Sequence, residues 1–355
     1  MSDITSPDWY EQTGELGSGR RLFYEQPAET VGVILAAGEG HRMGEISAHY
    51  PKPILPVCNH PLICSHMHLF QQLDVNRVVV VVGHQKDKVI EVARNYCPHG
   101  MSLTFIEQKE RLGIAHALNQ TREVVAGANL VVVLGDTYFI VDDIKAGLAR
   151  LKTGFQDGIA CVLSVRKVAD PEMIRRECTV RFDADGALEE IREKPVQPFN
   201  DLKPCGIYFF SPAIFDAIQF TNPSALRGEV EITDSIQSLV DLGYTVVSSP
   251  TVHWDRNINY PGDLLISNLV ELKRRKLDNL IGDDFTAHEE ASLVDSVVGH
   301  NVTIHSPARI VRSLVLDSAE VEEHGEFRDC VIGFRFAIAD CLRWEWADTP
   351  HWFSP

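Results

Sequence analysis

The sequence LAAGEGHRMG at residues 35–44 is followed by PKPILP at residues 51–56. The apolar run that leads into the first stretch, Val31 to Leu35, predicts a buried strand. Gly38 and Gly40 then allow the backbone to turn tightly and to approach a ligand. The two stretches therefore predict a strand that ends in a ligand-binding loop.

Two cations accompany this loop, because Arg42 lies within it and Lys52 is the lysine of PKP. Unpaired backbone N–H groups and positive side chains at the carboxyl end of a strand attract phosphate groups. Solvated loop cations are the alternative, but the adjacent glycine and proline restrict the backbone and favour the phosphate site. The loop by itself does not identify the phosphate compound.

Strand and helix patterns alternate after the loop. A β-branched run at Val78–Val82 precedes a helical pattern at Asp87–Tyr96, and a strand at Leu103–Ile106, a helix at Ile114–Val124 and a strand at Leu130–Leu134 follow. An uninterrupted apolar strand fits a parallel sheet that is covered on both faces. The alternation predicts an α/β fold with right-handed crossovers and with functional groups at the carboxyl ends of its strands.

The second half of the chain has a different character. Residues 161–210 contain short strands separated by turn signals, which predict an antiparallel addition to the sheet. Residues 231–243 and 261–276 have amphipathic helical patterns. We therefore expect one α/β domain at residues 31–280, preceded by a polar extension at residues 1–30.

The C-terminal unit, residues 285–355, shows a short repeat. Apolar residues recur at a spacing of six at Val298, Ile304, Ile310 and Leu316. This period suits two to three coils of a β-helix, in which each short strand points one apolar residue inward. An end coil exposes unpaired backbone, so we expect the tryptophan-rich tail at residues 341–353 to cap it.

Composition limits the functional class. The chain has 355 residues, 45% of them hydrophobic, and a formal net charge of −17. Such an acidic chain lacks the basic face that nucleic acid or an anionic membrane requires. No apolar segment reaches transmembrane length and the N-terminus lacks a signal-peptide core, so we expect a cytoplasmic protein. The eight cysteines form no CxxC pair and are expected to be free thiols.

Two common nucleotide motifs do not fit the loop, because Met43 occupies the last glycine position of GxGxxG and no Ser or Thr follows a Walker lysine. LAAGEGHRM followed by PKP instead resembles the signature of the sugar-1-phosphate nucleotidyltransferases. EQKERLGIAHAL with VVLGDTYF, and GIYFF with GEVEITD, most resemble the long-form glucose-1-phosphate thymidylyltransferases. The resemblance covers residues 31–275 and implies a Rossmann-like domain with a mixed, mostly parallel sheet, followed by a short left-handed β-helix.

The resemblance also implies a reaction. A sugar-1-phosphate oxygen attacks the α-phosphorus of a nucleoside triphosphate in line, and pyrophosphate leaves. Each pair of like charges in contact costs on the order of 4 kcal/mol at an effective dielectric of about 20, which cations offset. The implied partners are an NTP and a sugar-1-phosphate or a sugar-like cyclitol phosphate, and the implied cofactor is Mg²⁺. A homo-oligomer is also expected.

The matched motifs imply a nucleotide side of the site. Arg42 would hold the departing pyrophosphate, and Lys52 would reach the α-phosphate. Gln108 and Gly113 match the positions that read the pyrimidine, by a side-chain amide and a backbone group, without separating uracil from thymine. The residues expected along the nucleoside and its phosphates are Leu35, Ala36, Ala37, Gly38 and Gly40.

A metal site is implied beside the phosphates. Asp136, which follows the strand VVVL and Gly135, matches the family's metal-binding carboxylate. HWDRNINYPGDLL places Asn257 where a second metal aspartate usually stands, and an asparagine can still offer a carbonyl oxygen. Asp255, two residues away, is a competing ligand.

The acceptor side matches the family less well. Glu193 and Lys194, in REKP, match the pair that holds the sugar hydroxyls and the sugar phosphate. Counting back from Lys194 without a gap places the family's Tyr-Gly pair on Glu177 and Cys178, so the cysteine would add a side chain where a hydroxyl sits. This favours an acceptor other than glucose-1-phosphate, or else a local misalignment. The other matched sugar-side residues are Gly206 and Glu229.

A non-catalytic relative that binds a nucleotide sugar and regulates a partner is the alternative function. Arg42, Lys52, Asp136 and Lys194 favour the enzyme, since a regulator has little need of a metal carboxylate together with the phosphate cations. Asn257 at the second metal position favours the alternative.

Overall fold

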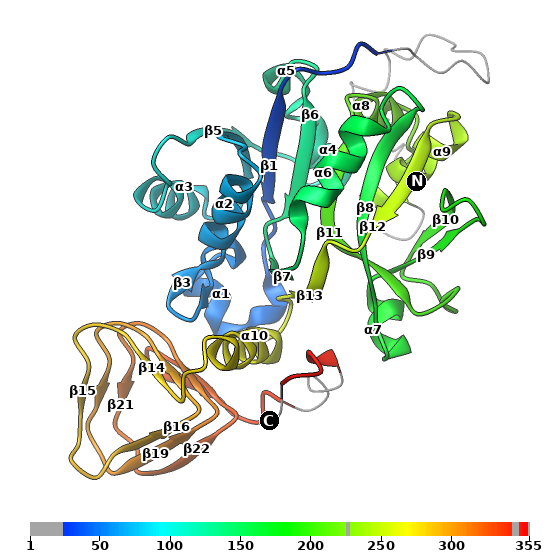
Figure 1. The fold of residues 1–355 in the computed structure, drawn as a ribbon. Coiled ribbons are helices and arrows are strands. Elements are labelled where there is room, and N and C mark those ends of the chain that lie inside the picture. The colour runs from blue at the N-terminus through cyan, green and yellow to red at the C-terminus, as the bar shows by residue number, and fades with distance from the viewer. Residues whose placement is uncertain (1–23, 225–227, 343–347, 354–355) are drawn as a thin grey trace, which may run out of the picture.

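The structure, a computed structural model, describes residues 24–224, 228–342 and 348–353. Its larger part is built on a seven-stranded sheet in the order β12-β8-β11-β6-β1-β4-β5 (Figure 1). β11 runs antiparallel to both of its neighbours, and the other adjacent strands are parallel, which confirms the predicted mixed, mostly parallel sheet. The strands are β1 (Thr30–Ala36), β4 (Arg77–Val82), β5 (Ser102–Glu107), β6 (Asn129–Leu134), β8 (Ile159–Lys167), β11 (Leu202–Phe210) and β12 (Thr245–Ser249).

The apolar run of β4 explains why helices cover both faces of the sheet. Val79 and Val81 pack with α4, α5, α8 and α9 on one face, and Val78 and Val80 pack with α2, α3 and α6 on the other. Successive side chains of a strand point to opposite faces, so a strand between two helical layers must be apolar throughout. The helices are α2 (Leu62–Gln72), α3 (Lys86–Asn95), α4 (Ile114–Asn119), α5 (Arg122–Val125), α6 (Ile144–Thr153), α8 (Ile214–Gln219) and α9 (Ile232–Asp241).

One predicted helix is wrong in extent. The helix expected at residues 114–124 is two short helices, α4 and α5. Thr121 lies between them, and its hydroxyl donates to the Leu118 carbonyl at 2.7 Å, a local bond that competes with helix continuation. Across the described residues, no helix has both the length and the apolar character needed to cross a membrane.

Two antiparallel pairs form separate two-stranded sheets beside the seven-stranded sheet. Residues 161–210, which predicted an antiparallel addition, supply one of these pairs and the antiparallel pairing of β11 with β8. β9 (Cys178–Phe182) pairs with β10 (Leu188–Glu193), after the short helix α7 (Pro171–Arg176). β7 (Thr137–Val141) pairs with β13 (Val252–Asn257). The second pair positions the site, because β7 starts directly after Asp136. Near the first loop lie α1 (Glu45–His49), β2 (Pro56–Val57) and β3 (His60–Pro61).

The C-terminal unit follows α10 (Pro261–Arg274) and consists of stacked short strands (Figure 1). Three parallel sheets, β14-β17-β20-β23, β15-β18-β21 and β16-β19-β22, form its sides, which fits a β-helix. Stacked polar side chains such as Ser296 and Ser313 lie 17 residues apart, so three sides of about six residues make one coil. The strands are β14 (Leu280–Ile281), β15 (Thr286–Ala287), β16 (Ser292–Val294), β17 (Val297–Val298), β18 (Thr303–Ile304), β19 (Ala308–Val311), β20 (Leu314–Val315), β21 (Glu320–Val321), β22 (Gly325–Arg328), β23 (Val331–Gly333) and β24 (Phe336–Ile338).

Only the start of the described tail meets the last coil, where the Cys341 N–H donates to the Asp329 carbonyl at 3.0 Å. β24 turns back antiparallel on β23 and closes the last coil. Trp352 instead donates to His253 of β13, and Asp348 binds Arg166 of β8, so this segment docks on the α/β domain. Trp344, Trp346 and residues 1–23 of the predicted extension lie outside the described residues. All eight cysteines are free, as predicted.

His66 of α2 is a buried histidine that the fold holds neutral. Its ring is 1% exposed, Nε2 donates to the Thr137 carbonyl at 2.9 Å, and Nδ1 has no hydrogen-bond partner among the described residues. Burial lowers the pKa of His66 to about 4. Between about pH 6.5 and pH 4 the unfolded chain therefore binds the extra proton, and stability falls as the pH falls through this window.

We expect His66→Gln to reduce the fall in the free energy of unfolding at acid pH by on the order of 3 kcal/mol. This is the value of a shift of about two to three pKa units. Urea unfolding of the wild type and the variant at pH 7 and pH 4.5 measures the difference. His99→Gln, at an exposed histidine, is the control and should keep the wild-type pH dependence. Equal pH dependence of His66→Gln and the wild type would contradict the assignment.

Candidate active site

The loop after β1 borders a cavity of about 380 Å³, here called the loop cavity. It lies at the carboxyl ends of the parallel strands, where the alternating pattern predicted functional groups. Ala36 does not line it, because its side chain is 2% exposed and packs in the core with Ile34. The predicted nucleotide-side residues that do line it are Leu35, Ala37, Gly38, Gly40, Arg42, Lys52, Gln108 and Gly113.

Lys52 lies at the floor of the loop cavity between two oxygens. Its Nζ is 2.9 Å from Asp136 Oδ2 and 2.8 Å from Asn259 Oδ1. The Lys52 side chain is 10% exposed, so these two contacts orient the ammonium group. Asn259 was not among the predicted residues, although it lies in the same stretch as Asn257. The sequence feature that could have identified Asn259 is its position two residues before the proline of YPGDLL.

Asp136 and Asn257 are neighbours because β7 pairs with β13. Asn257 is paired in register with Thr137, and the Thr137 hydroxyl donates to Asn257 Oδ1. Ile258 N also donates to the Asp136 carbonyl at 2.8 Å. The predicted pair of metal ligands is therefore brought together at one strand end.

This donor set was tested against the implied magnesium ion. Among the described residues no group of three or more His, Cys, Asp or Glu side chains is arranged to hold a metal. One carboxylate, Asp136, and one amide oxygen, Asn257, are present, and Mg²⁺ commonly takes one or two protein oxygens and completes its shell with phosphate oxygens and water. The residues fit a metal that arrives with a triphosphate.

Asp255 does not fit the competing role of metal ligand. Its side chain is 1% exposed, Oδ2 lies 2.6 Å from Lys203 Nζ, and Oδ1 binds Arg166 Nε. Both oxygens are thus engaged by cations in the interior. Asp255 is a buried ion-pair residue, which corrects the prediction.

Gln108 and Gly113 are in direct contact in the lining of the loop cavity. Gln108 Nε2 donates to the Gly113 carbonyl at 3.1 Å and lies 3.0 Å from His116 Nδ1. The amide nitrogen is therefore engaged, whereas no donor in the described part of the chain contacts the amide oxygen, which can accept from a ligand. Glu229, predicted on the sugar side, lines this cavity beside them instead.

A second cavity of about 750 Å³, here called the α7 cavity, adjoins the first. Arg42 and Asn259 line both cavities. Lys194 and Glu177 line the α7 cavity and are joined by the Lys194 N–H, which donates to the Glu177 carbonyl at 2.6 Å. Its other cations are Arg175, Arg176 and Arg256.

Four predicted acceptor residues, Cys178, Glu193, Gly206 and Glu229, do not line the α7 cavity. The Cys178 side chain is 7% exposed and lies within the β9 and β10 pair opposite Glu193, so the expected clash of its thiol with a sugar hydroxyl is not supported. Gly206 has φ +73°, and a Cβ there would lie 3.0 Å from Leu134 Cδ1. Its role is the close packing of β11 on β6.

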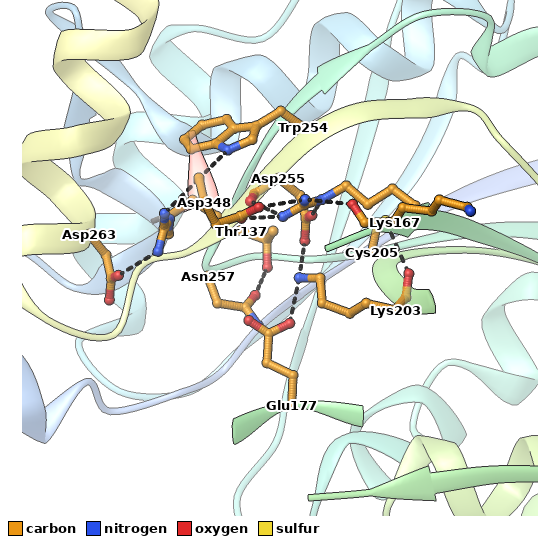
Figure 2. Close-up of polar contacts among 12 residues, drawn as sticks. Thr137, Lys167, Glu177, Lys203, Cys205, Trp254, Asp255, Asn257, Asp263 and Asp348 are labelled. Carbon is orange, nitrogen blue, oxygen red and sulfur yellow. Dashed lines mark hydrogen bonds and ion pairs between the residues drawn. The ribbon is translucent and has the colours of Figure 1, made fainter. Parts of the chain in front are cut away.

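Beneath the α7 cavity runs a chain of buried charges that sequence reasoning missed (Figure 2). Lys203 Nζ lies 2.5 Å from Glu177 Oε2 and 2.6 Å from Asp255 Oδ2. Arg166 binds Asp255 and makes two bonds to the Asp348 carboxylate, of 2.9 and 2.5 Å. No local pattern in LKPC or SVRK distinguishes these cations from solvated ones, because their partners are distant in sequence.

The buried side chains in this series of ion pairs remain charged, because each is paired with a side chain of opposite charge. Burial by itself would lower the pKa of Lys203, but Asp255 and Glu177 outweigh it and raise this pKa above its usual value. Burial likewise opposes ionisation of Asp255, but Lys203 and Arg166 hold its pKa below its usual value. Burial raises the pKa of Glu177, which stands at the end nearest the cavity.

Comparisons with known proteins identify the family. A family model described as Nucleotidyl transferase matches residues 31–260. The low-salt glycan biosynthesis nucleotidyltransferase Agl11 of Haloferax volcanii is 31% identical over 268 residues, 74% of this chain and 72% of that protein. Glucose-1-phosphate thymidylyltransferase of Streptomyces antibioticus is 30% identical over 251 residues, 70% and 66% of the two chains. A Bacillus anthracis crystal structure, assigned as a glucose-1-phosphate thymidylyltransferase and containing a sucrose, superposes with a TM-score of 0.58 at 27% identity over 67% of this chain and 94% of that one.

A mixed, mostly parallel sheet with a glycine-rich loop after β1, with Arg42 and Lys52 beside it and Asp136 after β6, is the arrangement of a nucleotidyltransferase. The chain belongs to the nucleotidyl transferase family, and within it to the sugar-1-phosphate nucleotidyltransferases. The resemblance drawn from its motifs and the prediction that it is an enzyme of this class are both confirmed.

The shape of the loop cavity depends on the close approach of Gly113 to the Val230 backbone. Gly113 has φ +108°, and a Cβ there would lie 2.4 Å from the Val230 carbonyl oxygen. We expect Gly113→Ala to displace the loop from Gln108 and to raise the KM for the nucleoside triphosphate at least about tenfold, since such strain costs about 1–3 kcal/mol. Steady-state kinetics with the triphosphate varied measures the effect.

Gly127→Ala is the matched control. Gly127 has φ +79° but open space where a Cβ would stand. Its variant should lose a little thermal stability and keep the wild-type KM. An equal KM for Gly113→Ala and Gly127→Ala would show that the close approach at Gly113 does not shape the cavity.

Proposed function

We propose that the chain condenses a nucleoside triphosphate, bound in the loop cavity, with a sugar-1-phosphate or sugar-like cyclitol phosphate, bound in the α7 cavity. The products are an NDP-sugar, or the corresponding cyclitol compound, and pyrophosphate. The observation that carries this proposal is that Arg42 and Asn259 line both cavities and so mark their junction. Asn259 contacts the Lys52 ammonium group, which also binds Asp136. Two phosphate compounds bound there would meet at this junction.

The chain's own residues account for the triphosphate side. The Gln108 amide oxygen can accept from the N3–H group of a pyrimidine, which uracil and thymine share. Lys52 would bind the α-phosphate, and Arg42 would bind the β- and γ-phosphates as they depart. Both cations lie on a loop whose position is fixed by backbone bonds such as Met43 N to Gly40 O at 2.9 Å. The charge is thus placed before the reaction begins.

The acceptor side carries the attacking group. Lys194 would hold the acceptor phosphate, so that one of its oxygens bonds to the α-phosphorus while the bond to the bridging oxygen of pyrophosphate breaks. Asp136 and Asn257 would hold Mg²⁺, which when bound neutralises phosphate charge and orients the triphosphate. Alignment of the two phosphates by fixed cations supplies most of the rate, because no covalent enzyme intermediate is needed.

We also propose that the C-terminal unit is a left-handed β-helix and that the enzyme is a homo-oligomer. Three parallel sheets and residues with positive φ at 17-residue intervals, such as Asp284, Asn301 and Ser318, support regular coils. Leu277 and Ile281, at the start of this unit, are exposed apolar side chains that a second copy would cover. Sedimentation of the full chain tests the assembly, and a monomer at micromolar concentration would overturn it.

Asp136→Ala tests the proposed function directly. We expect wild-type protein to release pyrophosphate from UTP or dTTP with a sugar-1-phosphate in magnesium, and the variant to lose at least about 10²–10³-fold in kcat. Chelation with EDTA should abolish the wild-type activity reversibly. Asp157→Ala, at an exposed aspartate, is the control and should keep full activity.

Circular dichroism and thermal melting would establish that Asp136→Ala is folded. Release of pyrophosphate by no combination in a panel of triphosphates and sugar- or cyclitol phosphates would instead favour the non-catalytic relative. Retained turnover in Asp136→Ala would remove this carboxylate from the metal site.

A further inference from the structure

We propose that Glu177 selects the acceptor by accepting a hydrogen bond from a hydroxyl or ammonium group on it, and that Lys203 is the residue that positions Glu177. This inference rests on the proposed function, since it names the group that the α7 cavity reads. It assigns to the buried charge chain a role in specificity.

Glu177 is placed to read an acceptor that Lys194 holds. It follows α7 directly, and its carbonyl accepts from the Lys194 N–H at 2.6 Å. Both side chains line the α7 cavity, and that of Glu177 is 18% exposed. A cation for phosphate and a carboxylate for a donor group are therefore tied together by one backbone bond.

Lys203 fixes the Glu177 carboxylate from below. The lysine side chain is fully buried, and its ammonium group lies 2.5 Å from Glu177 Oε2. A buried lysine without partners would lose its charge. The two carboxylates that Lys203 contacts, those of Glu177 and Asp255, therefore keep its ammonium group charged. One Glu177 oxygen is committed to Lys203, and no other hydrogen-bond donor contacts Oε1 within the described part of the chain.

Asp255, Arg166 and Asp348 hold Lys203 in place. Asp255 contacts Lys203 with one oxygen and Arg166 with the other, and Arg166 binds Asp348 through both oxygens. The Asp348 carbonyl accepts from Trp254 Nε1 at 2.8 Å, as Figure 2 shows. The chain of contacts thus joins four segments, β8, β11, β13 and the tail, to the single carboxylate at the cavity.

The chemistry of Glu177 defines what it recognises. An ionised carboxylate accepts hydrogen bonds and cannot donate them. A hydroxyl or ammonium group at the matching ring position satisfies it, whereas a hydrogen or an anionic group leaves it unpaired or repelled. Rejection of an analogue that lacks the donor is typical of sites built around a buried polar group.

Kinetics of Glu177→Gln, Lys203→Met and the double variant test the proposal. Each single variant should raise the acceptor KM at least about tenfold, the value of a hydrogen bond to a charged group, and leave the KM for the triphosphate within twofold. The double variant should be no worse than Glu177→Gln, because Lys203 acts through Glu177. Lys167→Met, at an exposed lysine of β8 that is also labelled in Figure 2, is the control and should keep wild-type values.

A panel of acceptors separates the two donor groups. Hexose-1-phosphates, their monodeoxy and amino analogues, and inositol phosphates should show one position at which removal of the donor costs the wild type at least about tenfold in kcat/KM and costs Glu177→Gln much less. Preference for the amino or the hydroxyl compound at that position identifies the group. Equal losses in wild type and variant at every position would overturn the proposal.

Asp348→Asn provides a second test of the proposal if Lys203→Met does not fold. It weakens the far end of the chain of contacts without leaving a buried charge beside the cavity, and it should raise the acceptor KM alone. Wild-type turnover with an unchanged acceptor KM in Glu177→Gln and Asp348→Asn would overturn this inference and leave the proposed function standing. Wild-type silence across the panel would overturn both.

Discussion

The contact of Lys52 with Asp136 and Asn259 is the interaction on which the rest of the site depends. It joins residues that are 84 and 207 positions apart in the chain. The same ammonium group therefore ties together the PKP segment after the glycine-rich loop, the end of β6 and the segment after β13. Asn259, one of the two partners of Lys52, lines both cavities, so a shift of any one of these segments would change how the two proposed substrate cavities adjoin.

One hydrophobic core supports both the loop and the C-terminal unit. Met43 of the loop and Trp254 of β13 pack in the same cluster as Leu265 of α10, Val297 of the first coils and Phe353 of the tail. The glycine-rich loop is thus anchored by an apolar residue at the position where a dinucleotide motif would have glycine. This shared core explains why the C-terminal unit belongs to the enzyme's structure and is more than an appended module.

The parts of the site that sequence could predict are those whose signal is local. Gly38 to Arg42, Gln108 and Asp136 lie within short motifs at strand ends. Gly38 to Arg42 and Gln108 line the loop cavity, and Asp136 contacts Lys52, which lines it too. Lys203, Arg166 and Asp348 could not be predicted, since they owe their function to partners up to 182 residues away. Cys178 shows the opposite kind of error. Counting back from Lys194 without a gap predicted that its side chain faces the sugar, but Cys178 pairs with Glu193 in the β9 and β10 sheet and its side chain is buried.

By itself, the sequence determined the class of fold and the family. Valine runs, helical periods and the loop motif are patterns between near neighbours, and the physics of burial translates them directly into strands, helices and a phosphate-binding turn. The tertiary structure alone decided which carboxylates face a ligand. Asp255 lies two residues from Asn257 and therefore on the same face of β13, yet the approach of Lys203 and Arg166 buries it. Glu177, which also contacts Lys203, borders the α7 cavity.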